Sequence, residues 1–275
     1  MLEQFNYVNH LGETLEFGKP PLFVNENDLR DFSWDVTKKN NKISGFSKGI
    51  VSKTIPIILK TETKEEAKRM KNKLFEVFEK DVLAEKYGKI ILGDYYLQCY
   101  VVDTSVSDYL IHDCYVSIDL KIQTDLPNWV RATQYRFRLG KSKENEEFLD
   151  YPHGTPFDYK NSLGVSELIN PSVKALEFNM VIYGGTVNPS IRIGDHEYSV
   201  NFDIGSNEYL TIDSKTKKIL LTRTDGKQIN CFNYRNKDDY TFKPIPPGNN
   251  VVASANENIK FDITLFEERS APEWI

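Results

Sequence analysis

Apolar and polar residues alternate over most of this chain, as they do in β-strands that bury one face. The clearest example lies near the C-terminus, where every second residue is apolar: Ile259, Phe261, Ile263 and Leu265. Just before it, Pro247 and Gly248 predict a tight turn. Proline fixes φ near −65°, and glycine accepts the positive φ that a type II turn requires. The stretch therefore predicts a turn followed by a half-buried strand.

The same period recurs through the second half of the chain. Apolar residues alternate in three short runs: Phe178, Met180 and Ile182; Ile191 and Ile193; Val200, Phe202 and Ile204. The stretches "YLTID" and "KKILLTR" continue the series, and turn signals such as "YGGTVNP" and "RTDGKQ" separate the runs. Short strands with turns about every ten residues predict an all-β sandwich or jelly roll.

One segment has a helical period instead. Thr63 and Glu66 have the spacing of a capping box, in which each residue satisfies a backbone N–H of the first turn. The following apolar residues share one stripe: Ala67, Met70, Leu74, Val77 and Phe78. Gly88 is the expected stop. Strand-like stretches flank this segment, so the first half predicts a β-sheet or sandwich with one packed helix at about residues 63–87.

The periodic pattern lapses in "GKSKENEEFLDYPHGTPFDYKNSLG", which is charged and then rich in Pro, Gly and Tyr. We interpret residues 139–164 as a linker or extended crossing. The chain then divides into residues 1–138, which hold the helix, and residues 139–275, which begin with this linker. A length of 275 residues suits two modest domains.

The net charge, the cysteine count and the lengths of the apolar stretches argue against several classes of function. The net charge of −5 argues against a nucleic-acid-binding surface. Three cysteines, at positions 99, 114 and 231, do not form a disulfide framework and suit a reducing compartment. The first ten residues lack the pattern of a signal peptide, and no apolar stretch approaches the roughly 20 residues of a membrane span. We expect synthesis in the cytoplasm and no membrane insertion.

Few patterns in the sequence indicate a catalytic or metal-binding site. Gly45 to Gly49 match G-x-S-x-G around Ser47, but a strand-like stretch follows where a nucleophile elbow needs a helix, so we interpret the match as a glycine-flanked loop. The histidines, at positions 10, 112, 153 and 196, are scattered and show no metal-ligand spacing. The sequence predicts no catalytic, cofactor or metal site. A glycosidase with two facing carboxylates is left open but unsupported.

Aromatic residues also gather within the expected linker. Tyr151, Phe157 and Tyr159 stand outside any regular strand in "FLDYPHGTPFDYK". Rings of this kind mark interfaces, so we expect these three residues to dock a partner or a domain. A platform for stacking sugars is the alternative.

Several ordered stretches resemble phage distal tail proteins, the Dit family. In the second half these are "YLTIDS" at Tyr209 to Ser214, the Asp225-Gly226 turn, and the "PGNN" turn before the alternating last strand. In the first half they are "LRDFSWDV", the single helix before "GKIILGDYYLQCYVVD", and "LPNWVRA". The resemblance covers nearly the whole chain.

The resemblance implies a mainly β fold: an N-terminal β-sandwich or split barrel with one packed helix, followed by a C-terminal galectin-like β-sandwich. It implies a structural protein of the virion tail tip, usually a hexameric ring, made in the host cytoplasm. The ring would join the tail tube protein to the tail hub and adhesion proteins. It would be formed by the first domain, with the second domain outside.

The galectin comparison is incomplete at the sugar site. "CFNYRNK" offers Asn233 and Arg235 without the histidine that galectins use, and no W-x-x-E-x-R motif occurs. The loops of the second half are also too short for the long arm by which some family members hold receptor-binding proteins. A carbohydrate-binding module that uses the C-terminal sandwich for host-surface glycans is the alternative function.

Overall fold

The computed structural model describes residues 4–110, 114–139, 166–256 and 258–274. It divides into two compact units, which we call unit 1 (Met1–Arg131 with Glu268–Ile275) and unit 2 (Ala132–Glu267). The backbone crosses between the units twice, within strands β10 (Trp129–Leu139) and β19 (Ile259–Arg269). Residues 140–165 lie outside the described part, so the linker at 139–164 and the division at 138 and 139 stay predictions.

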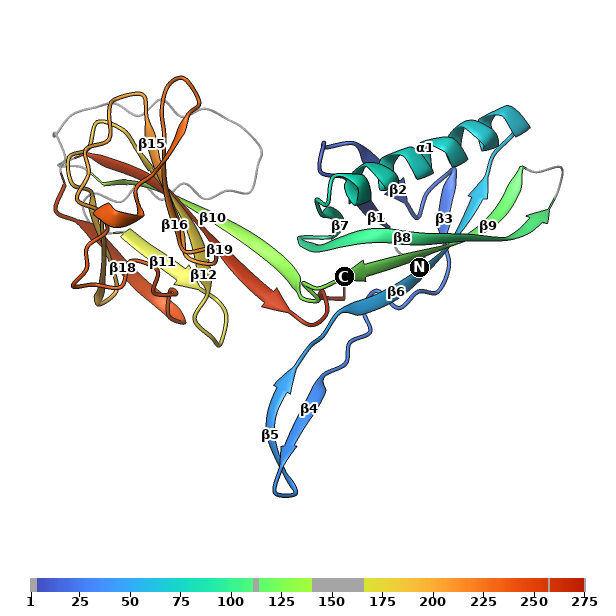
Figure 1. Ribbon diagram of the computed structural model, residues 1–275, viewed down its shortest axis with the longest axis horizontal. Coiled ribbons are helices and arrows are strands. Elements are labelled where there is room, and N and C mark those ends of the chain that lie inside the picture. The colour runs from blue at the N-terminus through green and yellow to red at the C-terminus, as the bar shows by residue number, and fades with distance from the viewer. Residues whose placement is uncertain (1–3, 111–113, 140–165, 257, 275) are drawn as a thin grey trace. The chain divides into compact units, whose positions relative to one another are not determined.

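Unit 1 consists of antiparallel strands and one α-helix (Figure 1). Its elements before β10 are β1 (Phe5–Val8), β2 (Thr14–Phe17), β3 (Leu22–Val24), β4 (Asp35–Lys39), β5 (Lys42–Ser47), β6 (Val51–Lys60), α1 (Lys64–Leu83), β7 (Gly88–Leu92), β8 (Tyr95–Leu110) and β9 (Tyr115–Thr124). The order β10-β8-β7-β1-β2 forms one part of the sheet, and β3-β6-β9-β8 forms the other. The long strand β8 belongs to both, because its start pairs with β7 and its remainder pairs with β9.

Helix α1 begins as its sequence predicts. The Thr63 hydroxyl accepts a 3.2 Å hydrogen bond from the backbone N–H of Glu66. The expected apolar stripe faces the core of unit 1, with Met70 partly buried and the rest buried: Ala67, Leu74, Val77 and Phe78. Figure 1 shows the helix lying across one face of the sheet.

The predicted stop at Gly88 is wrong. The helix ends at Leu83, and Glu85 takes the left-handed conformation at φ 52° that glycine usually supplies. The N–H groups of Glu85 and Lys86 donate to the carbonyls of Val82 and Asp81, which is the Schellman pattern. Gly88 instead opens strand β7.

Unit 2 is a sandwich of two antiparallel sheets. One sheet has the order β17-β16-β15-β12-β19-β10, and the other has the order β11-β18-β13-β14. The strands not yet given are β11 (Ser166–Asn170), β12 (Glu177–Tyr183), β13 (Ser190–Ile193), β14 (His196–Ser199), β15 (Tyr209–Asp213), β16 (Lys218–Thr222), β17 (Gln228–Asn230) and β18 (Gly248–Ser254). Side chains from both sheets form one core. The mainly β fold with one α-helix in the described residues is confirmed.

Most of the strand predictions for unit 2 are confirmed. The four apolar residues of β19 that alternate in the sequence are all buried. Gly248 has the expected positive φ, 86°, but it is the first residue of β18, so a strand that the sequence did not predict separates it from β19. The run from Val200 to Ile204 is an exception. It makes only isolated bridges, between Val200 and Arg235 and between Thr186 and Ile204, so its apolar residues reach the core without forming a strand.

Candidate functional site

Strands β4 and β5 form a hairpin that pairs with no other described strand. Its two-residue turn consists of Asn40 and Asn41, both with positive φ (51° and 59°), as a type I′ turn requires. In Figure 1 the hairpin extends away from the two parts of the unit 1 sheet. The loop predicted at Gly45 to Gly49 is wrong in part, because Gly45, Phe46 and Ser47 belong to strand β5.

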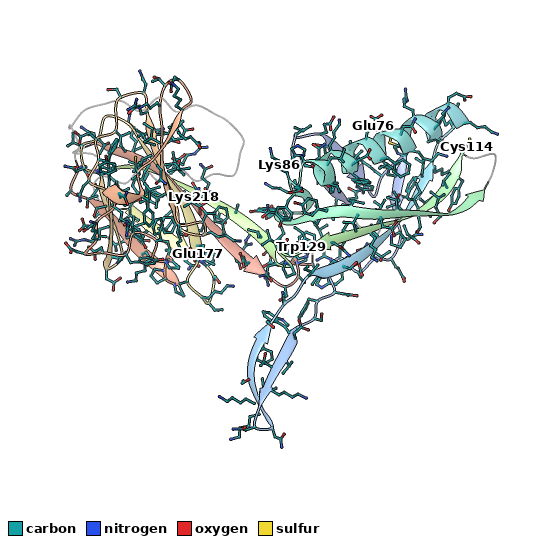
Figure 2. The ribbon with its side chains drawn as sticks, viewed as in Figure 1. Glu76, Lys86, Cys114, Trp129, Glu177 and Lys218 are labelled. Carbon is teal, nitrogen blue, oxygen red and sulfur yellow. The ribbon has the colours of Figure 1, made fainter. Side chains whose placement is uncertain are left out.

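The hairpin and its base expose large apolar side chains. Their exposed fractions lie between 43% and 75%: Phe32, Trp34, Val36, Ile43, Phe46 and Ile50. Three lysines, Lys38, Lys39 and Lys42, flank the turn. Figure 2 shows the side chains of β4 and β5 with no other element of unit 1 beside them. An isolated two-stranded hairpin is marginally stable in water, so this one is suited to pack against another surface.

The segment leading into the hairpin is fixed to the body of unit 1. The ammonium group of Lys53, on β6, donates to the backbone carbonyls of Asp28 (2.6 Å) and Asp31 (2.5 Å). Burial lowers the pKa of Lys53. The indole N–H of Trp129 donates to the carbonyl of Leu29 at 3.3 Å. These hydrogen bonds fix residues 28–31 to β6 and β10. The segment that precedes the hairpin is therefore anchored to unit 1.

In the part of the chain that the structure describes, no triad forms around Ser47. The residue ends strand β5 and is exposed, and residues 48–50 lead into strand β6, so no helix follows it. Ser47 therefore lacks, within the described residues, the strand–turn–helix setting of a nucleophile elbow. Of the four histidines, His112 and His153 lie outside the described residues. His10 pairs with Asp81, and Nε2 of His196 lies 2.9 Å from the carbonyl of Tyr240.

Neither a metal centre nor a membrane span emerges from the residues that the structure describes. They contain no group of three His, Cys, Asp or Glu residues placed to hold a metal ion. Their one α-helix is too polar to cross a membrane.

The predicted docking residues Tyr151, Phe157 and Tyr159 lie outside the described residues, and their role stays a prediction.

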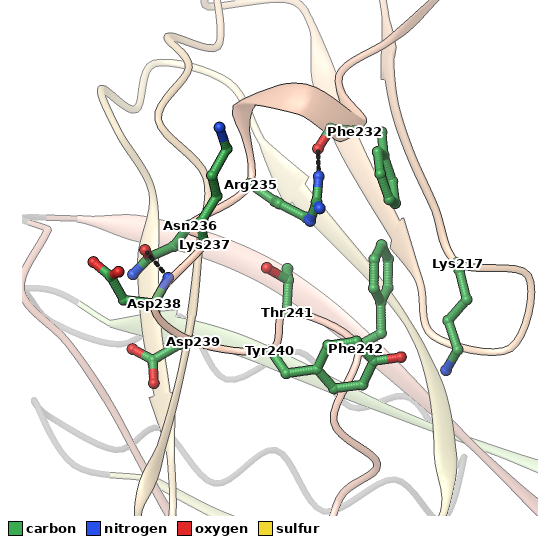
Figure 3. Close-up of a pocket in the computed structure, with 10 residues that line it drawn as sticks. All are labelled: Lys217, Phe232, Arg235, Asn236, Lys237, Asp238, Asp239, Tyr240, Thr241 and Phe242. Atoms are coloured by element: carbon green, nitrogen blue, oxygen red, sulfur yellow. Dashed lines mark hydrogen bonds between the residues drawn. The ribbon is translucent and has the colours of Figure 1, made fainter.

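Unit 2 carries a surface pocket of about 500 Å³. Figure 3 shows its lining, which comes from the turn between β15 and β16, from the 3₁₀ helix η1 (Phe232–Tyr234) and from the segment after it. Aromatic and charged side chains face the same space: Lys217, Phe232, Arg235, Asn236, Lys237, Asp238, Asp239, Tyr240, Thr241 and Phe242. Sequence reasoning missed this site, because its residues form no motif.

The two residues compared with galectins are placed differently. Arg235 lines the pocket, where its guanidinium lies 4.0 Å above the Phe232 ring and donates to the Phe232 carbonyl at 2.9 Å. Asn233 is exposed and does not line the pocket. The structure therefore does not assemble a galectin-type site from these two residues.

Comparison of the sequence with family models and with curated proteins finds no match. Comparison of the structure with solved structures does. SPP1 Dit, described as a paradigm of hub adsorption apparatus in Gram-positive-infecting phages, superposes with a TM-score of 0.60 and 9% identity, over 96% of this chain and 99% of that one. A chain of the phage P2 baseplate in its Ca-activated conformation superposes with a TM-score of 0.61 and 12% identity, over 99% and 100%.

The P2 baseplate activated with Sr gives the same values. At these identities the likeness concerns the fold, and it extends over nearly the full length of every chain compared. The resemblance noted from the sequence is thus confirmed at the level of the fold. This chain shares the fold of SPP1 Dit and of the P2 baseplate chain.

Proposed function

We propose that this protein is a structural component of a phage tail tip, where it forms the hub ring that links the tail tube to the host-adhesion apparatus. The observation that carries the proposal is the shared fold, which spans 96% to 99% of the chain and has relatives in an adsorption hub and a baseplate. Its place would be the virion, and its partners would be the tail tube protein, the tail hub and the adhesion proteins.

The hairpin β4–β5 supplies a surface for self-association. Its exposed apolar residues would be covered by unit 1 of a neighbouring copy, which would remove them from water. The lysines at its turn carry charge opposite to the chain's net charge of −5, so a second copy is an electrostatically suitable partner. A contact of hairpin to body uses two different patches and therefore closes into a ring when the rotation allows it.

The two domains would then have separate tasks. Unit 1, with the hairpin, would form a ring of six copies, and unit 2 would lie outside it. The described residues favour a structural role over an enzymatic one, because the one sequence match to a catalytic motif, around Ser47, lacks the helix and the partners that its chemistry requires.

Electron microscopy and sedimentation velocity of the concentrated full-length protein test this proposal. We expect closed rings for the wild type. Phe46→Glu should prevent ring formation while leaving the thermal unfolding temperature unchanged, because the Phe46 side chain is 62% exposed. Val173→Glu is the matched control, since Val173 is an apolar residue of unit 2 with 98% exposure. It should form rings as the wild type does.

Two results would overturn the proposal at different points. If no rings form at any concentration or in crystals, the proposal that this chain forms a ring is wrong. Normal rings from Phe46→Glu would leave the ring but exclude the hairpin as its contact.

A further inference from the structure

The pocket of unit 2 plays no part in the proposed ring, and its two walls differ in chemistry. One wall is aromatic: the Phe232 and Phe242 rings stack with centroids 5.9 Å apart, and Tyr240 meets Phe242 edge-on at 5.9 Å. Phe242 is buried, whereas Tyr240 is 56% exposed. Phe242 packs against the Tyr240 ring and the Lys217 ammonium lies 5.7 Å from its centroid, so Tyr240 can offer its remaining exposed ring surface to a ligand (Figure 3).

The other wall carries hydrogen-bonding groups that the protein leaves unused. The carboxylates of Asp238 and Asp239 make no hydrogen bond or ion pair with any described residue; the bond in this segment runs from the Asp238 backbone N–H to Oδ1 of Asn236 at 3.0 Å. Both carboxylates lie on the side of the pocket opposite Lys217 in Figure 3. They remain available as acceptors for a ligand that donates.

A buried hydroxyl between the two walls is also without a partner. Thr241 is 1% exposed, and its Oγ1 is the one buried side-chain polar atom in the described residues that makes no hydrogen bond. Buried hydroxyls nearly always have a partner, and an exception in a native structure calls for an explanation. In Figure 3 this hydroxyl points toward the space enclosed by Arg235 and the aspartates.

The aromatic wall and the unpaired carboxylates together favour one chemical class of ligand over others. An apolar ligand would bury the two aspartates without giving them donors, which is unfavourable. The lining carries both signs of charge, with Lys217, Arg235 and Lys237 against Asp238 and Asp239, so a strongly charged ligand of either sign would meet like charge within the pocket. A sugar ring offers an apolar C–H face for Tyr240 and a rim of hydroxyls that donate to carboxylates and accept from Asn236 or Lys237. The volume of about 500 Å³ is in the range of small-molecule sites.

We propose that this pocket binds a neutral saccharide, with Tyr240 as its stacking platform and Asp238, Asp239 and Asn236 as its hydroxyl partners. The site is distinct from the galectin type, because it uses neither the missing histidine nor Asn233. It gives unit 2 a binding role in addition to the proposed structural role of the chain, and its test does not depend on ring formation.

Saturation-transfer NMR on the full-length protein provides the test, with methyl glucoside, methyl galactoside and N-acetylglucosamine as probes at about 10 mM, suited to millimolar binding. We expect saturable transfer to at least one probe. Tyr240→Ala and Asp239→Asn should each weaken that binding about tenfold or more. Tyr209→Ala is the matched control, since Tyr209 is a 40% exposed tyrosine of unit 2 outside the pocket.

Thermal unfolding of each variant checks that the fold is intact, and Asp239→Asn keeps the test decisive if Tyr240→Ala unfolds. Saturable binding that both pocket variants weaken and the control preserves supports the site. Lack of transfer to all three probes overturns it. So does binding that the pocket variants leave unchanged, or binding of inorganic phosphate, followed by phosphorus NMR, in place of the sugars.

Discussion

The hydroxyl of Tyr7 donates a 2.6 Å hydrogen bond to Oδ2 of Asp81, which joins strand β1 to the end of helix α1. The other oxygen of this fully buried carboxylate accepts from the His10 backbone N–H at 2.8 Å and pairs with His10 Nδ1 at 2.5 Å. Asp81 is therefore satisfied on both oxygens, as a buried charge must be. The pair also depends on Gly88, because no side chain at that position would leave it room.

Gly88→Ala should destabilise unit 1. A Cβ at position 88 would lie 2.1 Å from the Tyr7 hydroxyl and 2.4 Å from Oδ2 of Asp81, so the pair would have to separate. We expect a loss of at least about 2 kcal/mol in the free energy of unfolding, measured by urea titration. Gly45→Ala is the control, since the nearest atom to its Cβ would be 4.0 Å away. Equal stabilities for the two variants would contradict the packing described.

Cys99 should make the protein sensitive to alkali. Burial raises the pKa of the Cys99 thiol to about 12, against about 8.5 in an unfolded chain. Between these values the folded state holds more protons than the unfolded state, so stability is complete below about pH 8.5 and falls as the pH rises toward 12. The fall should reach about 1.4 kcal/mol per pH unit from this group.

Cys99→Ala removes that contribution. Its unfolding free energy, measured by urea titration from pH 8 to pH 11, should decline less steeply than that of the wild type, although its absolute stability is lower because a small cavity replaces the sulfur. Parallel curves for the two proteins would show that Cys99 does not titrate in this way.

Lys53→Met should loosen the base of the hairpin. The substitution keeps an unbranched apolar stem but leaves the carbonyls of Asp28 and Asp31 without their donor, which costs about 1–3 kcal/mol. Hydrogen exchange of the amides in residues 25–31 should accelerate. Lys60→Met is the control on the same strand, because Lys60 is exposed. Unchanged exchange in Lys53→Met would mean that the remaining bonds, from the Trp129 indole to Leu29 and from the Thr54 N–H to Asp28, are enough to hold the segment.

Ser47→Ala should leave stability and assembly as they are in the wild type, apart from effects within about 0.5 kcal/mol that exposed positions usually show. The serine lies at the exposed end of β5 with no helix after it. Covalent labelling of Ser47 by a fluorophosphonate probe, detected by mass spectrometry, would refute this expectation.

The helix and the buried strands were predictable because local chemistry and burial agree there. Thr63 caps the helix, the residues after it form one stripe, and the apolar residues of β19 alternate as its pairing requires. Gly88 misled the prediction because Glu85 closes the helix in a conformation that its residue type rarely takes. The tightly packed contact of Gly88 with Tyr7, 81 residues earlier, has no local signature.

The hairpin and the pocket escaped prediction for different reasons. Both strands of the hairpin are exposed on both faces, so alternation of apolar and polar residues could not reveal them; the Asn40-Asn41 pair was the available signal. The pocket joins Lys217 to residues 232–242, which only the tertiary structure brings together.

The second backbone crossing, at Glu267 and Glu268, returns the end of the chain to unit 1, where Arg30 donates to the carbonyls of Pro272 and Glu273 and lies 4.2 Å from the Trp274 ring. Tension between the two units is therefore carried by two covalent connections in parallel. If the chain is cleaved at one of these connections, the other connection still joins the two units. A protein fused after residue 275 would be attached to unit 1.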